Sequence, residues 1–317
     1  MKDVAMSFLS VTEKAAAAVY PYIGKGDKIT ADEQATRAMR AELDQQPYKT
    51  RVVIGEGEMD EAPMLYIGEI LGQAEATHID LAVDPIDGTT PVAQGQGNAI
   101  AVLAGAPKGS LLHAPDMYMK KIAVGPKAAG AIHLEKSLEE NLKAVADASG
   151  KKISELTIMV QERERHDEDI QLIQRLGASV KLFTEVDITC AIATALEEFE
   201  ADMLIGVGGA PEGVIAAAAL KSLGGDFQGQ LLPKNEEEYK RCISMRIEDP
   251  DQVLTLEEIV IGEDCFFIAT GITDGPLLRG VQNDRSANLK THSFLSYGGQ
   301  YHFIESTHVQ TVEHTSV

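Results

Sequence analysis

The segment Val83-Asp84-Pro85-Ile86-Asp87-Gly88-Thr89-Thr90 follows an apolar run that begins at Ile79. An apolar run bounded by proline and glycine predicts a short buried strand that ends in a turn. The segment places two carboxylates and two hydroxyls after that strand, and oxygen ligands of this kind suit Mg²⁺ or Mn²⁺ better than zinc. An acidic β-turn is the alternative, because Asp-Pro and Asp-Gly are common turn pairs. The segment alone therefore leaves a hard-metal phosphate site and a plain turn both open.

Two further acidic segments favour the metal site. Val52-Val53-Ile54 leads into Gly55-Glu56-Gly57-Glu58-Met59-Asp60-Glu61, another apolar run that ends in glycines and carboxylates. Upstream, the spacing of Thr30 and Glu33 predicts a helix capping box, which would put Asp32 in the first helical turn. A carboxylate there is also favoured by the helix dipole alone. Acidic segments at the ends of several predicted elements match a two-metal phosphoryl site, because carboxylates repel each other unless cations hold them together.

Four motifs follow one another along the chain. They are Gly55 to Tyr66, Asp84 to Thr89, His113 to Met119 and Gly208 to Gly213. Together they resemble the class II fructose-1,6-bisphosphatases of bacteria, and the resemblance covers nearly the whole chain. That family belongs to a superfamily of lithium-sensitive, metal-dependent sugar phosphatases, in which the second motif is shared and identifies the chemistry but not the substrate. Inositol monophosphatases carry a tryptophan-containing motif downstream, whereas this chain has no tryptophan.

The pattern of apolar residues predicts an α/β fold. Helical periodicity precedes the first strand, and strand and helix alternate in the second half, which predicts helices that cover a sheet. We expect residues 1–135 to form a metal-binding half and residues 136–317 to form a substrate-binding half that contributes Glu212. The family resemblance alone implies the order of layers, an α-β-α-β-α sandwich with the active site between two halves. The predicted strands are 52–54, 79–83, 99–103, 121–124 (all four in the first half), 156–160, 180–183, 203–207 and some from 292 onward; the predicted helices are 4–18, 31–45, one from 137, 167–176, 188–199 and 212–223, and 234–241 is expected to be an exposed loop or helix.

Composition limits the partners of the protein. The chain has 317 residues, 44% of them hydrophobic, which is enough for a large core. Its 28 basic and 49 acidic residues give a net charge of −21, which disfavours nucleic acid and anionic membranes as partners. Cys190, Cys242 and Cys265 are far apart and lack metal-ligand spacing, so we expect reduced thiols, as in a cytoplasmic protein. No signal-peptide core is expected at the N-terminus, and no segment reaches the roughly 20 apolar residues of a membrane span.

The resemblance implies a catalytic centre built on metals. Two or more Mg²⁺ or Mn²⁺ ions would lower the pKa of a water that attacks phosphorus in line, with no covalent intermediate. Thr89 would orient or deprotonate that water, Lys28 would offset charge on the phosphoryl oxygens, and Asp60 is also implied as catalytic. A structural role is the alternative for Glu212, because the helix dipole alone would favour a glutamate at the helix start after Pro211. The implied metal ligands are Asp32, Glu56, Asp84, Asp87 and Glu212.

A basic segment follows the predicted strand 156–160. Arg163 and Arg165 alternate there, and guanidinium groups match the geometry of the phosphate that is kept rather than cleaved. A solvated charge run is the alternative, but the position matches the substrate-binding segment of the family. The substrate contacts that the resemblance implies are Asp87, Gly88, Thr89, Tyr118, Arg163, Glu164, Arg165, Glu185, Val186, Asp187 and Gly209.

Two positions depart from the family pattern. The family commonly has glutamate where this chain has Asp87, which is one methylene shorter and leaves the preferred metal open. Its usual Asp-Gly-Asp pattern is Glu185-Val186-Asp187 here, and a β-branched residue in place of glycine restricts the loop. These departures leave the range of bisphosphate substrates open.

The resemblance implies hydrolysis of the 1-phosphate of fructose 1,6-bisphosphate to fructose 6-phosphate and phosphate, as in gluconeogenesis. Sedoheptulose 1,7-bisphosphate is a candidate second substrate. The alternatives are an inositol or other sugar monophosphatase of the same superfamily, and a noncatalytic relative that binds sugar phosphates. Family analogy alone leads us to expect a homo-oligomer, either a dimer or a tetramer.

Overall fold

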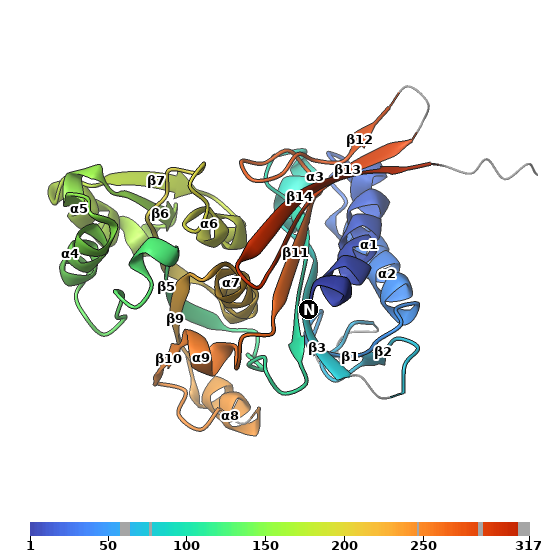
Figure 1. The fold of residues 1–317 in the computed structure, drawn as a ribbon, viewed down its shortest axis with the longest axis horizontal. Coiled ribbons are helices and arrows are strands. Elements are labelled where there is room, and N and C mark those ends of the chain that lie inside the picture. Colours follow the sequence, from blue (N-terminus) through green and yellow to red (C-terminus); the bar gives the residue numbers. More distant parts are fainter. Residues whose placement is uncertain (58–63, 76–77, 246, 285–287, 310–317) are drawn as a thin grey trace, which may run out of the picture.

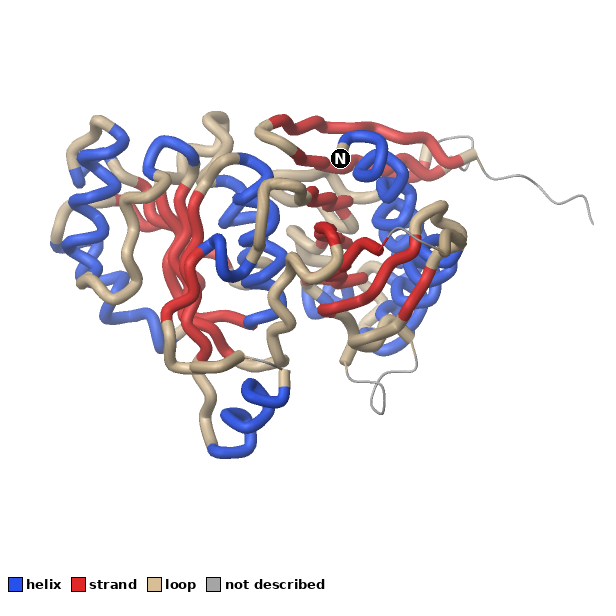
Figure 2. Tube along the Cα trace, turned by 60° about the horizontal axis from the view of Figure 1, so that its bottom comes forward, coloured by secondary structure: helices blue, strands red, loops and turns tan. Residues whose placement is uncertain are grey.

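Two β-sheets organise the chain, with helices between them and on both outer faces (Figure 1). The same layers are visible in the rotated view of Figure 2, where helices flank each sheet. This computed structural model describes residues 1–57, 64–75, 78–245, 247–284 and 288–309.

The first sheet has eight strands in the order β12-β13-β11-β4-β3-β1-β2, with β14 paired to β13. β1 and β3 are parallel, and the other pairings are antiparallel. Both faces of its central strands are buried, which explains their nearly continuous apolar sequence. The strands are β1 (Lys49–Ile54), β2 (Ile70–Leu71), β3 (His78–Asp87), β4 (Ile100–Pro107), β11 (Phe266–Gly271), β12 (Gln282–Asn283), β13 (Leu289–Tyr297) and β14 (Gln300–His308).

The second sheet has six strands in the order β10-β9-β5-β8-β6-β7. The neighbours β8, β6 and β7 are parallel, as the alternation of strand and helix predicts, whereas β5 runs antiparallel to β8 and β9. The strands are β5 (Tyr118–Val124), β6 (Thr157–Gln161), β7 (Ser179–Phe183), β8 (Met203–Gly209), β9 (Asp226–Leu231) and β10 (Val253–Thr255).

Helices complete five layers. α1 (Lys2–Val19) and α2 (Lys28–Asp44) pack on the outer face of the first sheet, and α4 (Leu138–Ser149) and α5 (Asp167–Arg175) pack on the outer face of the second. α6 (Asp187–Ala193) and α7 (Ala210–Leu223) lie between the sheets. α7 is apolar on all sides, as a helix buried between two sheets must be. The predicted α-β-α-β-α sandwich is therefore confirmed. The remaining helices are α3 (Thr89–Gln94), α8 (Glu236–Ser244) and α9 (Leu256–Ile259), with short 3₁₀ turns η1 (Tyr20–Tyr22), η2 (Pro126–Ala128), η3 (Ile153–Glu155) and η4 (Glu164–His166).

The two sheets are not consecutive in sequence. β5 belongs to the second sheet, although residues 121–124 were expected in the first half, and β11 to β14 return to the first sheet. The division into residues 1–135 and 136–317 stays a prediction about domains, but the sheets do not follow it. The reason is that β4 and β5 each pair with strands far along the chain, which local periodicity does not reveal.

The start of α2 differs from the prediction in a way that concerns the site. Asp27 is the N-cap, and its side chain accepts a hydrogen bond from the Thr30 backbone N–H at 3.0 Å. The capping box predicted from Thr30 and Glu33 is therefore wrong, and Asp32 lies beyond the first turn. Because the dipole effect falls off within that turn, it does not explain an acidic residue at Asp32.

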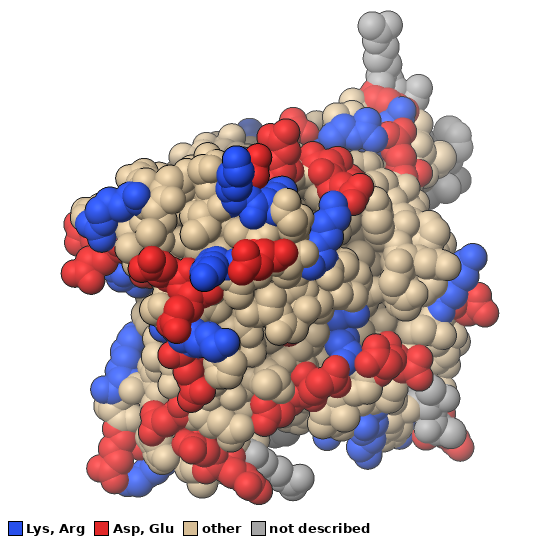
Figure 3. Space-filling model, turned by 60° about the vertical axis from the view of Figure 1, so that its left-hand side comes forward, with Lys and Arg blue, Asp and Glu red and all other residues tan. Residues whose placement is uncertain are grey.

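The surface carries charges of both signs. On the face shown in Figure 3, basic side chains are interspersed with acidic ones. Among the described residues, none of the helices combines the length and the apolar character needed to cross a bilayer. The three cysteines are buried and form no disulfide.

Candidate active site

Asp84 and Asp87 lie on the same strand. β3 runs on through Asp87 instead of ending at Val83. In a regular strand, residues three apart point to opposite faces, but the pairing of β3 with β4 shifts register between Asp84 and Asp87. An irregularity of this kind changes the direction of the following side chain, so both carboxylates turn toward one site.

Charges from three other elements converge on Asp84: Glu212 at the start of α7, Glu56 after β1 and Asp32 in α2. Burial raises the pKa of Asp84 well above its ordinary value, and the charges of Glu212 and Glu56 raise it further. The pKa of Asp87 is also raised, first by burial and then by the charges of Asp84 and Glu212. Strand β3, the end of β1 and the start of α7 therefore bring their carboxylates into one cluster.

Asp32 and Glu56 form the edge of this cluster. The interaction between their carboxyl groups raises the pKa of Glu56 and opposes the rise in the pKa of Asp32. Burial, and next the charge of Asp32, raise the pKa of Glu56 to about 7. The pKa of Asp32 is raised mainly by burial. Glu56 follows the end of β1, whereas Asp32 lies in α2. The tertiary fold therefore brings the two carboxyl groups together.

Glu212 joins the cluster from the first turn of α7. Gly209 caps that helix, and a Cβ at Gly209 would lie 1.9 Å from Glu212 Oε2, so only glycine leaves room for the carboxylate. Burial raises the pKa of Glu212, although the nearby Lys121 ammonium lowers it. One oxygen each of Glu212 and Asp87 is buried without a hydrogen-bond partner among the described residues.

The cluster fits hard divalent cations in charge and donor type. All five predicted ligands offer oxygens only, and their mutual repulsion and unpartnered oxygens are what Mg²⁺ or Mn²⁺ would satisfy. In the part of the chain that the structure describes, no three acidic, histidine or cysteine side chains are placed closely enough to hold an ion as they stand. The side chains would therefore have to draw together on binding. The predicted catalytic residue Asp60 lies outside the described residues.

Thr89 and Lys28 lie beside the cluster. Thr89 is the first residue of α3, and Gly88 before it has a φ of 102°, a left-handed conformation that favours glycine. Lys28 Nζ donates a hydrogen bond to Thr90 Oγ1 at 2.7 Å, which fixes the ammonium next to the start of this helix. Within the described residues, the Thr89 hydroxyl makes no hydrogen bond and is free to bind a water or substrate.

Arg165, rather than Arg163, stands over Tyr118. Arg165 Cζ lies 5.2 Å from the centroid of the Tyr118 ring, and its Nη2 donates to the Val207 carbonyl at 2.7 Å. Arg163 donates to the carbonyl of the adjacent Glu162 instead. The two predicted arginines thus do not form one fork in this structure. Glu164, the other predicted contact in the segment, is exposed in η4.

The segment 185–187 lies against the Asp84 to Thr89 motif. Val186 is buried at φ 67°, the left-handed region where the family pattern has glycine. A Cβ at Gly88 would come within 3.1 Å of Val186 Cγ2, so the two segments touch. Asp187 Oδ2 forms an ion pair with Lys121 Nζ at 2.7 Å. Glu185, two residues earlier, is partly buried.

A family model described as "Bacterial fructose-1,6-bisphosphatase, glpX-encoded" matches residues 2–308. This chain belongs to the class II fructose-1,6-bisphosphatases. The "Fructose-1,6-bisphosphatase class 2" of Haemophilus influenzae is 45% identical over 301 residues, covering 91% of this chain and 90% of the relative. The "Fructose-1,6-bisphosphatase 1 class 2" of Escherichia coli is 45% identical over 312 residues, covering 94% and 92%. A Synechococcus relative named "D-fructose 1,6-bisphosphatase class 2/sedoheptulose 1,7-bisphosphatase" is 43% identical over 330 residues, covering 96% and 95%.

Sequence reasoning about this bisphosphatase missed two lysines. Lys121 was expected only as a strand residue, yet it is buried and paired with Asp187. A Cβ at Gly208 would lie 3.1 Å from Lys121 Nζ, so the lysine crosses directly under β8. The sequence feature that could have indicated Lys121 is a charged residue at an inward position of an apolar strand. Lys234, which is close to Tyr118, gave no such signal. The hydroxyl of Thr90 was part of the opening motif, but its hydrogen bond with Lys28 was not predicted.

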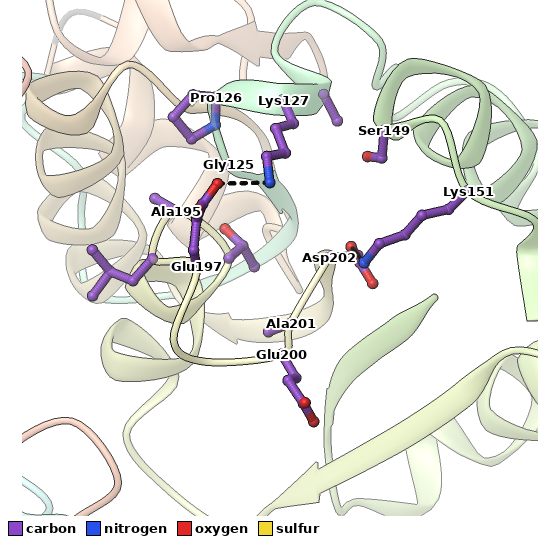
Figure 4. A pocket seen from close by; sticks show the side chains of 13 residues that line it. Gly125, Pro126, Lys127, Ser149, Lys151, Ala195, Glu197, Glu200, Ala201 and Asp202 are labelled. Carbon is purple, nitrogen blue, oxygen red and sulfur yellow. Dashed lines mark hydrogen bonds and ion pairs between the residues drawn. The ribbon is translucent and has the colours of Figure 1, made fainter. Parts of the chain in front are cut away.

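A separate pocket of about 280 Å³ lies at the other ends of β5, α6 and β8 (Figure 4). Its two lysines are already paired: Lys127 with Glu197 at 2.8 Å and Lys151 with Asp202 at 2.5 Å. The pocket contains none of the predicted metal ligands of the bisphosphatase. It therefore lies apart from the predicted site.

The metal-free bisphosphatase is expected to lose stability as the pH rises from about 5 to 7. The folded state binds more protons than the unfolded state in this range, because burial raises the pKa of Glu56 from 4.5 to about 7. Stability therefore falls with rising pH, by about 2 kcal/mol over this range from Glu56 alone. Thermal unfolding in EDTA across this range measures the loss, and excess Mg²⁺ at pH 7.5 should restore the melting temperature. A melting temperature that rises with pH in EDTA would contradict the repulsive cluster.

Proposed function

We propose that this chain hydrolyses the 1-phosphate of fructose 1,6-bisphosphate to fructose 6-phosphate and inorganic phosphate. The observation that carries the proposal is the convergence of Asp84, Asp87, Glu56, Asp32 and Glu212 beside Thr89. The names of its relatives, at 45% identity over most of the chain, support the substrate.

The acidic cluster would hold the cations, and the neighbouring polar groups would position the reactants. When bound, two or more Mg²⁺ or Mn²⁺ ions would supply an activated water and stabilise charge on the phosphoryl group. The free hydroxyl of Thr89 would orient the attacking water. As the water oxygen forms the new bond to phosphorus and the water gives up a proton, the bond from phosphorus to sugar O1 breaks and O1 takes up a proton. The Lys28 ammonium, held by Thr90, would offset the negative charge that grows on the phosphoryl oxygens.

The opposite end of the site suits the phosphate that is kept. Arg165 lies beside the exposed Tyr118, and β5 pairs Tyr118 with Gly209, which contacts Glu212. Arg165 contacts Val207 of β8, and Glu212 lies against Gly209, two residues further along the same strand. Val207 and Gly209 are about 7 Å apart in an extended strand. Glu185 and Asp187 would bind sugar hydroxyls between these ends, with Val186 and Gly88 forming the wall.

The remaining features are proposed on family grounds. Sedoheptulose 1,7-bisphosphate is a candidate second substrate, since a relative of 43% identity is named for both activities. We propose a homo-oligomer, dimer or tetramer, in the cytoplasm. The buried, unpaired cysteines support a reducing compartment.

Release of phosphate from a panel of sugar phosphates tests this function. We expect turnover of fructose 1,6-bisphosphate with Mg²⁺ or Mn²⁺, none in EDTA, and much slower turnover of inositol monophosphate. Faster turnover of monophosphates than of the bisphosphate would favour the sugar monophosphatase alternative. Binding of the bisphosphate without release of phosphate would identify a noncatalytic relative.

A further inference from the structure

Tyr118 is contacted by a second cation from a different part of the chain. Lys234 Nζ lies 4.4 Å from the centroid of the Tyr118 ring, and Arg165 Cζ lies 5.2 Å from the same centroid. Both distances are within the range of cation–π attraction. The Tyr118 side chain is 40% exposed, so the two cations gather at an open surface.

Neither cation has an acidic partner in the regions that the structure describes. Arg165 uses Nε and Nη2 to donate to Val207 O and Gln161 Oε1, which leaves the Nη1 donors free. Lys234 forms no ion pair there. Two unpaired cations at one ring repel each other, and an anion between them would remove the repulsion.

The backbone fixes the position of Lys234. The N–H of Leu232 donates to the Tyr118 carbonyl at 2.9 Å, which continues the pairing of β9 with β5. The N–H of Lys234 donates to Glu238 Oε2 at 2.7 Å, and Asn235 caps α8. Backbone hydrogen bonds before and at Lys234 therefore hold the lysine beside Tyr118.

We infer that Lys234 is the third side chain of the site for the retained phosphate, with Arg165 and Tyr118, and that it makes the enzyme select bisphosphates. The inference rests on the proposed function. A phosphate dianion between the guanidinium and the ammonium would accept charged hydrogen bonds from both, and one from the phenol. A substrate without this second phosphate gains nothing from Lys234.

The test compares Lys234→Gln with Lys240→Gln, which removes the same charge six positions later. Lys240 pairs with Glu236 on the surface of α8 and has no place in the site. We expect Lys234→Gln to raise KM for fructose 1,6-bisphosphate and Kd for fructose 6-phosphate on the order of tenfold, the loss of one charged hydrogen bond. We expect kcat to change less than about threefold, and Lys234→Arg to recover most of the affinity.

Fructose 1-phosphate, used as a competitive inhibitor, separates the two ends of the site. Its inhibition constant should be the same in Lys234→Gln and in the wild type, because it lacks the retained phosphate. An unchanged Kd for fructose 6-phosphate in Lys234→Gln, or equal weakening of both monophosphates, would overturn the inference while bisphosphate turnover by the wild type still supports the proposed function. Absence of bisphosphate turnover in the wild type would overturn both.

Discussion

Replacing Asp84 with asparagine is expected to abolish turnover and to stabilise the metal-free protein. The amide keeps the shape of the side chain but removes the charge on which Glu212 and Glu56 converge. Loss of a cation ligand should lower kcat by on the order of 10³-fold or more. The same change removes a buried, repelled carboxylate, so the melting temperature in EDTA at pH 7.5 should rise by at least about 2 °C, the shift that 1 kcal/mol gives in a large domain.

Asp80→Asn is the matched control on the same strand. Asp80 is buried, but it pairs with Arg51 through both oxygens, at 3.0 and 2.8 Å, and accepts the Gly109 N–H. Removing this charge leaves a poorly paired guanidinium and should destabilise the protein by about 2 kcal/mol or more. If Asp84→Asn destabilised the metal-free protein as Asp80→Asn does, or retained near-native kcat, Asp84 would be a structural residue.

Thr89→Ala is expected to lower kcat on the order of 10² to 10³-fold without changing stability. The Thr89 hydroxyl has no partner in the described parts of the fold, so its loss leaves no group unsatisfied. A group that positions or deprotonates the attacking water contributes a factor of this size. Steady-state kinetics with saturating Mg²⁺ and a thermal unfolding curve measure both quantities.

Thr89→Ser provides the control for this prediction. Serine keeps the hydroxyl and removes only the methyl group, so kcat should stay within about tenfold of the wild type. Near-native turnover by Thr89→Ala, or equal losses in alanine and serine, would show that the hydroxyl does not act on the water.

Local elements could be predicted from sequence where one signal dominates. The strand at Met203 and the helix that begins at Ser137 were both predicted, and the structure adds that Ser137 and Glu140 form a capping box at the start of that helix. β3 was ended too early, because Pro85 indicates a break, whereas the strand accommodates it at a shift of register before Asp87. The pairing of β5 with β8 and β9 joins distant segments and has no local signal.

Some residues of the site could likewise be predicted from local signals, and others could not. The carboxylates occur in motifs with apolar strands and glycines beside them, so their convergence could be expected. Lys121 pairs with Asp187, 66 positions away, and Lys234 approaches Tyr118 only because β9 pairs with β5. The left-handed conformation of Val186 is also set by tertiary contacts, since valine alone disfavours it.

A crystal soaked in Mn²⁺ and measured at the manganese absorption edge tests the shared cation site most directly. We predict anomalous peaks bounded by the carboxylates of Asp32, Glu56 and Asp84 on one side and of Asp87 and Glu212 on the other, with the side chains drawn inward. Peaks only at other surfaces, with Glu56, Asp84 and Glu212 unliganded, would contradict the account.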